Sequence, residues 1–263
     1  MPYEHVFDEI IVPTIYVAIG IVGVIGNLMV ITIIVNNQTL KRLTTNVLIA
    51  NLAISDLMVI VLCIPPLFVG KIMKSGWSFG DIGCRVFAFT FDLLVLVSVY
   101  SLVLMSIDRY IAIVHYQRKQ WRTLRNTYFS LLVIWSVAIL VSITTIFTHK
   151  LKRTKSVEGA NDNDTVAYCG HYDGMSGDLL AYIEGVYTFV VPFVIITILY
   201  FLIIRSLIKH KRNMAAGSVR NDGGTGSSPH HRVTQVSKTV FVVIITFVIC
   251  WLPYCVFLFI RVS

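Results

Sequence analysis

Charged residues are scarce in this chain. Only 14% of its 263 residues are Asp, Glu, Lys or Arg, whereas 56% are hydrophobic and the mean hydropathy is +0.76. A soluble domain carries roughly 25% charged residues. The shortage of charge therefore excludes a soluble globular protein and predicts an integral membrane protein.

Polar interruptions are also rare within the hydrophobic runs. Six apolar segments can be marked, at about 10–35, 45–69, 82–114, 127–147, 179–208 and 237–260. Each is long enough for a helix to cross a hydrocarbon core of ~30 Å. Because the runs stay apolar throughout, they exclude the alternating strands of a membrane β-barrel. The sequence predicts an all-α membrane protein.

Basic residues are distributed unevenly between the connections. If the N-terminus is outside, the inner connections hold 14 Lys and Arg, and the outer ones hold eight. Cytoplasmic loops carry the excess of basic residues, so an extracellular N-terminus is favoured and the net charge of +8 needs no nucleic-acid partner. We expect an outer tail at 1–9, a membrane domain over 10–263, and a flexible Gly- and Ser-rich inner loop at 209–236.

Cysteines are few, and three of the five lie well within predicted spans. Cys84, at the outer end of the third span, and Cys169 are the two predicted on the outer side. In an oxidising compartment such a pair is expected to form a disulfide, with two free thiols as the alternative. Asn163 begins an Asn-Asp-Thr glycosylation sequon in the same outer loop as Cys169.

Polar residues within the spans are the candidates for function. Asp56 lies in the second run, where a carboxylate is unfavourable unless it holds a cation or joins a hydrogen-bond network. A purely structural polar cluster is the alternative. Asp108 and Arg109 end the third run, and a solvated pair just beyond the membrane is their simplest interpretation. Gly23 and Gly26 in the first run could simply allow close helix contact.

Features of two other classes of membrane protein are missing. The sequence has neither a pore-loop-like segment nor an inverted repeat, which a transporter or channel would need. An intramembrane enzyme would need a Ser–His pair or two aspartates within the spans, but the histidines lie at span ends or in loops. We therefore expect no enzymatic activity, and keep a six-span transporter or channel subunit as the alternative function.

Short motifs in all six runs follow one another in a specific order. They are Gly26-Asn27, Asn51-Leu52-Ala53 with Asp56, Cys84 with Cys169, Asp108-Arg109-Tyr110, Trp135, Pro192 with Tyr200, and Cys250-Trp251-Leu252-Pro253. Together they resemble the rhodopsin-like family of G-protein-coupled receptors. The stretch 101–115 is similar to galanin and insect allatostatin-A receptors, while Thr44-Thr45-Asn46 and Trp77-Ser78-Phe79-Gly80 point to peptide receptors generally.

This resemblance implies a bundle of seven transmembrane helices at the plasma membrane, of which six are present. The seventh helix, with its Asn-Pro-x-x-Tyr motif, is missing from the sequence, so we expect a fragment or a truncated gene product.

The resemblance also implies a ligand cavity open to the outside. Phe91 stands where amine receptors carry an aspartate, which argues against a monoamine ligand. The expected ligand-binding residues are Phe91, Asp92, Glu184, Tyr187, Trp251, Tyr254 and Phe257. An aromatic cavity with two carboxylates suits a peptide ligand. The alternative for Asp92 is that it faces a neighbouring helix.

On the inner side, the resemblance implies a switch that reaches a heterotrimeric G protein. Helix six would swing outward about Pro253, and Arg109 would leave Asp108, its only expected restraint because 233–238 lacks an acid. The expected switch residues are Asp108, Arg109, Tyr110, Tyr200, Val99, Pro192, Phe247, Trp251 and Pro253. Asp56 and Ser98 resemble a site for an allosteric sodium ion, and no other cofactor is expected. Arrestin, a receptor kinase and membrane lipid are further implied partners.

Overall fold

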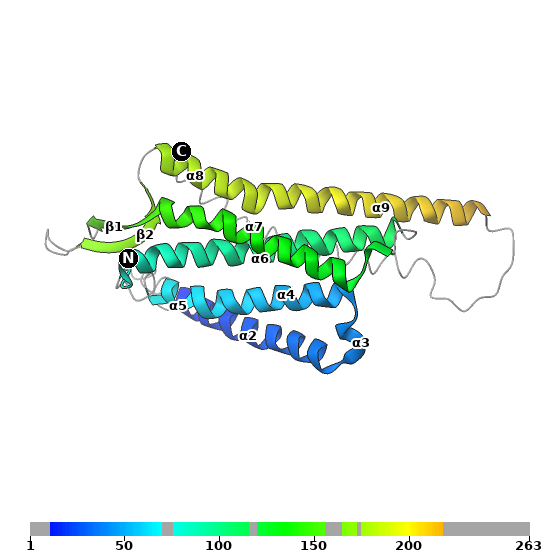
Figure 1. The fold of residues 1–263 in the computed structure, drawn as a ribbon, viewed down its shortest axis with the longest axis horizontal. Coiled ribbons are helices and arrows are strands. Elements are labelled where there is room, and N and C mark those ends of the chain that lie inside the picture. The colour runs from blue at the N-terminus through cyan, green and yellow to red at the C-terminus, as the bar shows by residue number, and fades with distance from the viewer. Residues whose placement is uncertain (1–10, 70–75, 116–119, 156–164, 173–174, 218–263) are drawn as a thin grey trace. The chain divides into compact units, whose positions relative to one another are not determined.

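The computed structural model describes residues 11–69, 76–115, 120–155, 165–172 and 175–217. These residues are mainly helical (Figure 1). The helices are α2 (Val12–Asn36), α3 (Gln38–Lys41), α4 (Thr44–Met58), α5 (Ile64–Leu67), α6 (Gly80–Ile113), α7 (Leu124–Thr148), α8 (Met175–Gly185) and α9 (Val191–Gly217). Two strands, β1 (His149–Lys155) and β2 (Thr165–His171), form a hairpin between α7 and α8.

Five helical stretches among the described residues are long and apolar enough to cross a membrane. They are Pro13–Asn36, Thr44–Leu67, Gly80–Ile113, Leu124–Thr148 and Leu179–Lys209. They match the first five expected runs and confirm an all-α membrane fold. The sixth expected run, 237–260, and the expected tail at 1–9 lie outside the described residues. The helical backbone of α9 continues to Gly217, so the first part of the expected flexible loop at 209–236 is helical.

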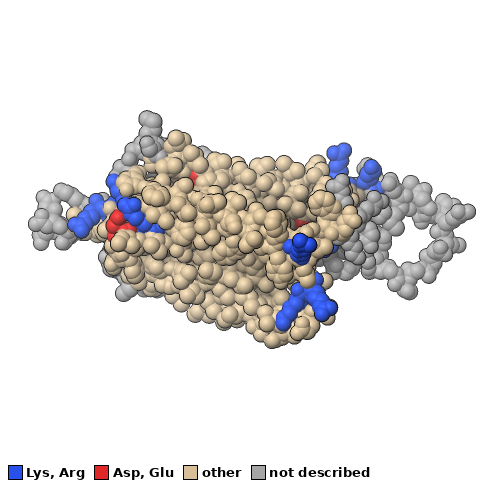
Figure 2. All heavy atoms as spheres, viewed as in Figure 1, with Lys and Arg blue, Asp and Glu red and all other residues tan. Residues whose placement is uncertain are grey.

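The surface of α2 is suited to lipid. This helix contains no Asp, Glu, Lys or Arg, and its apolar side chains are exposed around most of its circumference. A helix that is hydrophobic all round belongs in an apolar environment. Figure 2 shows this uncharged surface over α2, with basic side chains gathered beside α3.

The contact between α2 and the α4–α5 segment is close at one glycine. A Cβ added to Gly23 would lie 2.7 Å from Cδ1 of Ile60, whereas a Cβ on Gly26 would meet no heavy atom within 4 Å. Gly23 therefore allows the two segments to approach, and Gly26 does not serve this purpose within the described residues. Asn27 donates its side-chain amide to the carbonyl of Gly23, 2.9 Å away, which satisfies this polar group within its own helix.

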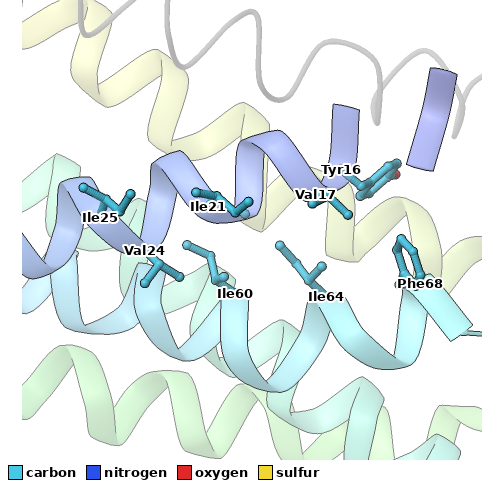
Figure 3. Close-up of a pocket in the computed structure, with 9 residues that line it drawn as sticks. Tyr16, Val17, Ile21, Val24, Ile25, Ile60, Ile64 and Phe68 are labelled. Carbon is cyan, nitrogen blue, oxygen red and sulfur yellow. The ribbon is translucent and has the colours of Figure 1, made fainter. Parts of the chain in front are cut away.

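Beside this contact lies an open apolar groove, shown in Figure 3. It is lined by Tyr16, Val17, Gly20, Ile21, Val24, Ile25, Ile60, Ile64 and Phe68. Of the expected ligand-binding residues that the structure describes, none lines this groove. Its side chains offer hydrocarbon contact and no charge, which is the chemistry of a surface that faces acyl chains.

Prolines are preceded by widened helical turns. A π-helical turn at Val59–Cys63 comes just before Pro65 and Pro66, and another at Val186–Val190 comes just before Pro192. A proline lacks an N–H and its ring crowds the carbonyl four residues earlier, so the preceding turn cannot keep regular α-helical bonding. The distortion near the end of the second span therefore takes the form of a π turn.

A chain of hydrogen bonds joins α7, α4 and α6. Trp135 donates its indole N–H to Oδ1 of Asn51 at 3.0 Å, and Asn51 donates its amide to Oγ of Ser101 at 2.8 Å. Ser101 in turn donates to the carbonyl of Val97 at 2.6 Å. Polar side chains that bond across helices stabilise membrane bundles, because each would otherwise remain unsatisfied in an apolar interior.

We expect Asn51→Leu to lower the thermal stability of the purified protein in detergent. The substitution removes both inter-helix bonds and leaves the Trp135 N–H unsatisfied, a loss of about 1–3 kcal/mol. Ser136→Ala is the matched control, since Ser136 is exposed on the same helix as Trp135. An unchanged thermal unfolding midpoint for Asn51→Leu would show that these hydrogen bonds contribute nothing to stability.

Candidate functional site

The N-terminal end of α6, which is expected to face outside, is covalently linked to the hairpin. Cys84 and Cys169 form a disulfide with their Cα atoms 5.4 Å apart, which confirms the expected pair. The two strands pair antiparallel from His149 opposite His171 to Lys155 opposite Thr165. The hairpin itself was not expected, because β1 is largely basic and lacks the alternation of apolar residues that predicts a strand.

A second, noncovalent link between α6 and the hairpin was missed from the sequence. Asp81 accepts a hydrogen bond from the backbone N–H of Leu151 at 2.9 Å and pairs with Nε of Arg85 at 2.8 Å. The other guanidinium nitrogens of Arg85 donate to the carbonyl of Ile146 at 2.9 Å and to the hydroxyl of Tyr172 at 3.4 Å. The only available signal was the (i, i+4) spacing of an acid and a base at the start of a span.

Aromatic rings run from this linked end along α6. Trp77 lies 5.3 Å from Phe79 and 5.2 Å from Phe87, measured between ring centroids, and Phe87 stacks on Phe91 at 6.0 Å. Phe91, an expected ligand contact, is thus the inner member of an aromatic series. Phe87 was not among the expected residues, although it lies one helical turn from Phe91 on the same face.

The structure corrects the expected role of Asp92. Its side chain is 2% exposed, and its carboxylate accepts a hydrogen bond from Oγ of Ser142 in α7 at 2.8 Å. Asp92 therefore faces the neighbouring helix, which was the alternative interpretation, and is not presented as an anion for a ligand.

The other expected residues are distributed between the described and undescribed parts of the chain. Glu184 is half-buried in α8, and Tyr187 is half-buried in the π turn that follows. Val99, Pro192 and Tyr200 are buried. Outside the described residues lie Asn163, Phe247, Trp251, Pro253, Tyr254 and Phe257.

Asp56 and Ser98, the two residues expected at a sodium site, are in contact. The hydroxyl of Ser98 lies 3.2 Å from Oδ1 of Asp56 and 2.9 Å from Oγ of Ser55. Ser98 has a single hydroxyl proton, so it donates to one of these acceptors at a time. Ser55 donates to the carbonyl of Leu52 at 2.9 Å. One carboxylate and two hydroxyls therefore meet between α4 and α6.

At the C-terminal end of α6, which is expected to face inside, Asp108 is bound by an arginine that was not expected. Nε and Nη2 of Arg122 donate to Oδ1 and Oδ2 of Asp108 at 2.7 and 2.9 Å. The hydrogen bonds and charge of Asp108 raise the pKa of the Arg122 guanidinium above its usual value. Arg109 is exposed, and within the described residues it makes no ion pair. The expectation that Asp108 restrains Arg109 is therefore wrong for this structure.

The family described as "7 transmembrane receptor (rhodopsin family)" matches residues 26–263 of the sequence. The chain belongs to this family. The family fold is a bundle of seven membrane helices, and the described residues supply five of them. Because this is a family of multi-pass membrane receptors, and not of transporters, channels or enzymes, the transporter or channel alternative finds no support.

Several relatives are similar to most of this chain. The allatostatin-A receptor of Bombyx mori is 30% identical over 252 residues, which cover 95% of this chain and 66% of the relative. The type-1 angiotensin II receptor A of Xenopus laevis is 32% identical over 263 residues, covering 98% and 66%. The neuropeptide Y receptor type 6 of Oryctolagus cuniculus is 30% identical over 247 residues, covering 90% and 63%.

These relatives agree with the expected resemblance to an allatostatin-A receptor, while the resemblance to galanin receptors stays a prediction. The chain spans just under two thirds of the length of these relatives, at 66%, 66% and 63%.

We expect Asp81→Ala to loosen the hairpin at β1. Removing the carboxylate takes away the acceptor for the Leu151 N–H, so hydrogen exchange at this amide should become several-fold faster while the disulfide remains intact. Asp81→Asn is the matched control, because it keeps an oxygen acceptor and loses only the charge. Equal exchange in the wild type and Asp81→Ala would contradict the link.

Proposed function

We propose that this chain is the membrane body of a plasma-membrane receptor, with its N-terminus outside, that binds an extracellular peptide and activates an intracellular heterotrimeric G protein. The observation that carries the proposal is membership of the rhodopsin-like family over residues 26–263. The disulfide that holds the hairpin at the outer end of α6 supports a ligand site on that side. Similarity to receptors named for allatostatin-A, angiotensin II and neuropeptide Y supports a peptide ligand.

The described residues favour a ligand with aromatic or aliphatic anchors. Phe91 continues an aromatic series with Phe87 and Trp77, and large rings supply most of the binding energy at such contacts. Asp92 is bonded to Ser142. Glu184, half-buried in α8, stays an expected contact for a basic or amidated group on the peptide, as the family resemblance implies.

Signal transmission would follow the family pattern. An agonist that binds the active state better than the inactive one shifts the population toward it, and about 5.5 kcal/mol of preference changes the ratio from 1:99 to 99:1. Helix six would turn outward about Pro253, and Arg109, already exposed, would meet the G protein near Tyr200. Arrestin and a receptor kinase are further proposed partners.

A sodium ion between α4 and α6 is part of the proposal. Hard cations prefer oxygen donors, and the Asp56 carboxylate with the Ser98 and Ser55 hydroxyls presents this chemistry. Asp56 and Ser98 would hold the ion, which would supply the positive charge that an acid at this depth requires and would stabilise the inactive state.

The direct test is to express the full-length gene product and screen amidated neuropeptides for binding and for second-messenger responses. With an active peptide in hand, we expect Arg109→Ala to bind it with unchanged affinity and to lose most G-protein activation, because the exposed cation is removed. Arg42→Ala, which removes an exposed cation near α3, is the control and should signal normally. Full activation by Arg109→Ala would reject the role of Arg109.

We also expect Asp56→Asn to abolish the effect of sodium on agonist affinity. Agonist binding is measured with sodium or with an organic cation at equal ionic strength, and sodium should weaken binding only in the wild type. Asp92→Asn removes another acid within the membrane and should keep the sodium effect, since Asp92 is bonded to Ser142. A sodium effect that persists in Asp56→Asn would rule out the ion site.

A further inference from the structure

Arg122 lies in the connection between α6 and α7, and two of its guanidinium nitrogens donate hydrogen bonds to Asp108. The two hydrogen bonds measure 2.7 and 2.9 Å. The Asp108 side chain is 8% exposed and that of Arg122 is 24% exposed, so the pair is largely shielded from water. A bidentate guanidinium–carboxylate pair with little exposure is stronger and more specific in geometry than a pair on an open surface.

The backbone around Arg122 is fixed by the start of α7. Oγ1 of Thr123 accepts a hydrogen bond from the N–H of Asn126 at 3.2 Å, which caps the helix. The side-chain amide of Asn126 donates to the carbonyl of Trp121 at 3.0 Å. These bonds hold Trp121 and Thr123, the residues on both sides of Arg122. The turn therefore positions the Arg122 guanidinium to bind Asp108.

The other end of this connection is also attached to α6. The hydroxyl of Tyr110 and Nε2 of His115 are 3.2 Å apart, and their rings meet edge to face with centroids 5.3 Å apart. Asp108 and Tyr110, two residues apart on the inner turn of α6, therefore hold the two ends of the connection.

This arrangement separates Asp108 from its neighbour Arg109. Successive residues point about 100° apart on a helix, and both oxygens of Asp108 are engaged by Arg122. Arg109 is left exposed. The sequence alone suggested the opposite pairing, because Asp108 and Arg109 are adjacent.

We propose that Arg122 is a positioning residue for G-protein activation: it draws the Asp108 carboxylate away from Arg109. The inference rests on the proposed function. Without Arg122, the Asp108 carboxylate pairs with Arg109, and the cation that the G protein needs is partly withdrawn.

The test compares Arg122→Gln alone and in an Asp108→Asn background, in the full-length gene product with surface expression measured. Arg122→Gln should reduce agonist potency for G-protein activation about fivefold or more, with peptide affinity unchanged in the absence of G protein. In the Asp108→Asn background the same substitution should have no further effect, because no carboxylate remains to capture Arg109. Arg122→Lys keeps the positive charge but loses the two-nitrogen geometry of the guanidinium. Its agonist potency should lie between those of the wild type and Arg122→Gln.

Arg125→Gln is the matched control, since Arg125 is an exposed arginine in the first turn of α7. It should leave potency unchanged. Raised potency in Arg122→Gln, or an equal loss with and without Asp108, would overturn the proposal, because either result means that Arg122 does not act through Asp108.

A readout without G protein separates this proposal from the proposed function. The thermal midpoints of the wild type, Arg122→Gln, Asp108→Asn and the double variant form a double-mutant cycle. Non-additive midpoints support the pair, whereas additive midpoints overturn it. If the wild type activates no G protein with any peptide, the proposed function fails while the cycle still decides whether the pair exists.

Discussion

The absence of water from a bilayer core is the constraint on which this structure depends. Every polar side chain within the spans must find a partner in the protein, since an unsatisfied group there is strongly unfavourable. Some of the described polar side chains bond to a carbonyl of their own helix, as Asn27 does. Others are paired between helices: Trp135 with Asn51, Ser98 with Asp56, and Ser142 with Asp92. These bonds set which faces of α4, α6 and α7 meet, a choice that apolar packing alone leaves open in lipid.

Both ends of α6 are secured, but by different chemistry. At the N-terminal end a disulfide and the Asp81–Arg85 network hold the hairpin, which suits the ligand entrance proposed on that side. At the inner end the connection to α7 is held by hydrogen bonds and one ion pair. Noncovalent contacts can exchange partners, as the proposed G-protein coupling would require, whereas a covalent bond cannot.

Much of the fold follows from hydropathy. The first five spans and the pairing of Cys84 with Cys169 were predicted from the sequence. Length and apolar character decide what can cross a bilayer, and just these two cysteines were predicted to lie outside. The hairpin was not predicted, since its strands are held by the disulfide and by Asp81 more than by an apolar face of their own. The roles of the expected site residues stay predictions, apart from the corrected positions of Asp92 and Asp108.

The sequence by itself determined the family, the spans and the motif residues, because each depends on residue type and spacing along one helix. Only the tertiary structure decided the partners. Asp92 could have faced a cavity or a helix, and Asp108 could have bound Arg109 or another cation. A carboxylate pairs with whichever donor reaches it within about 3 Å. Whether a donor comes that close depends on how parts of the chain that are distant in sequence pack together. Here Ser142 approaches Asp92 and Arg122 approaches Asp108, and no local sequence pattern encodes either contact.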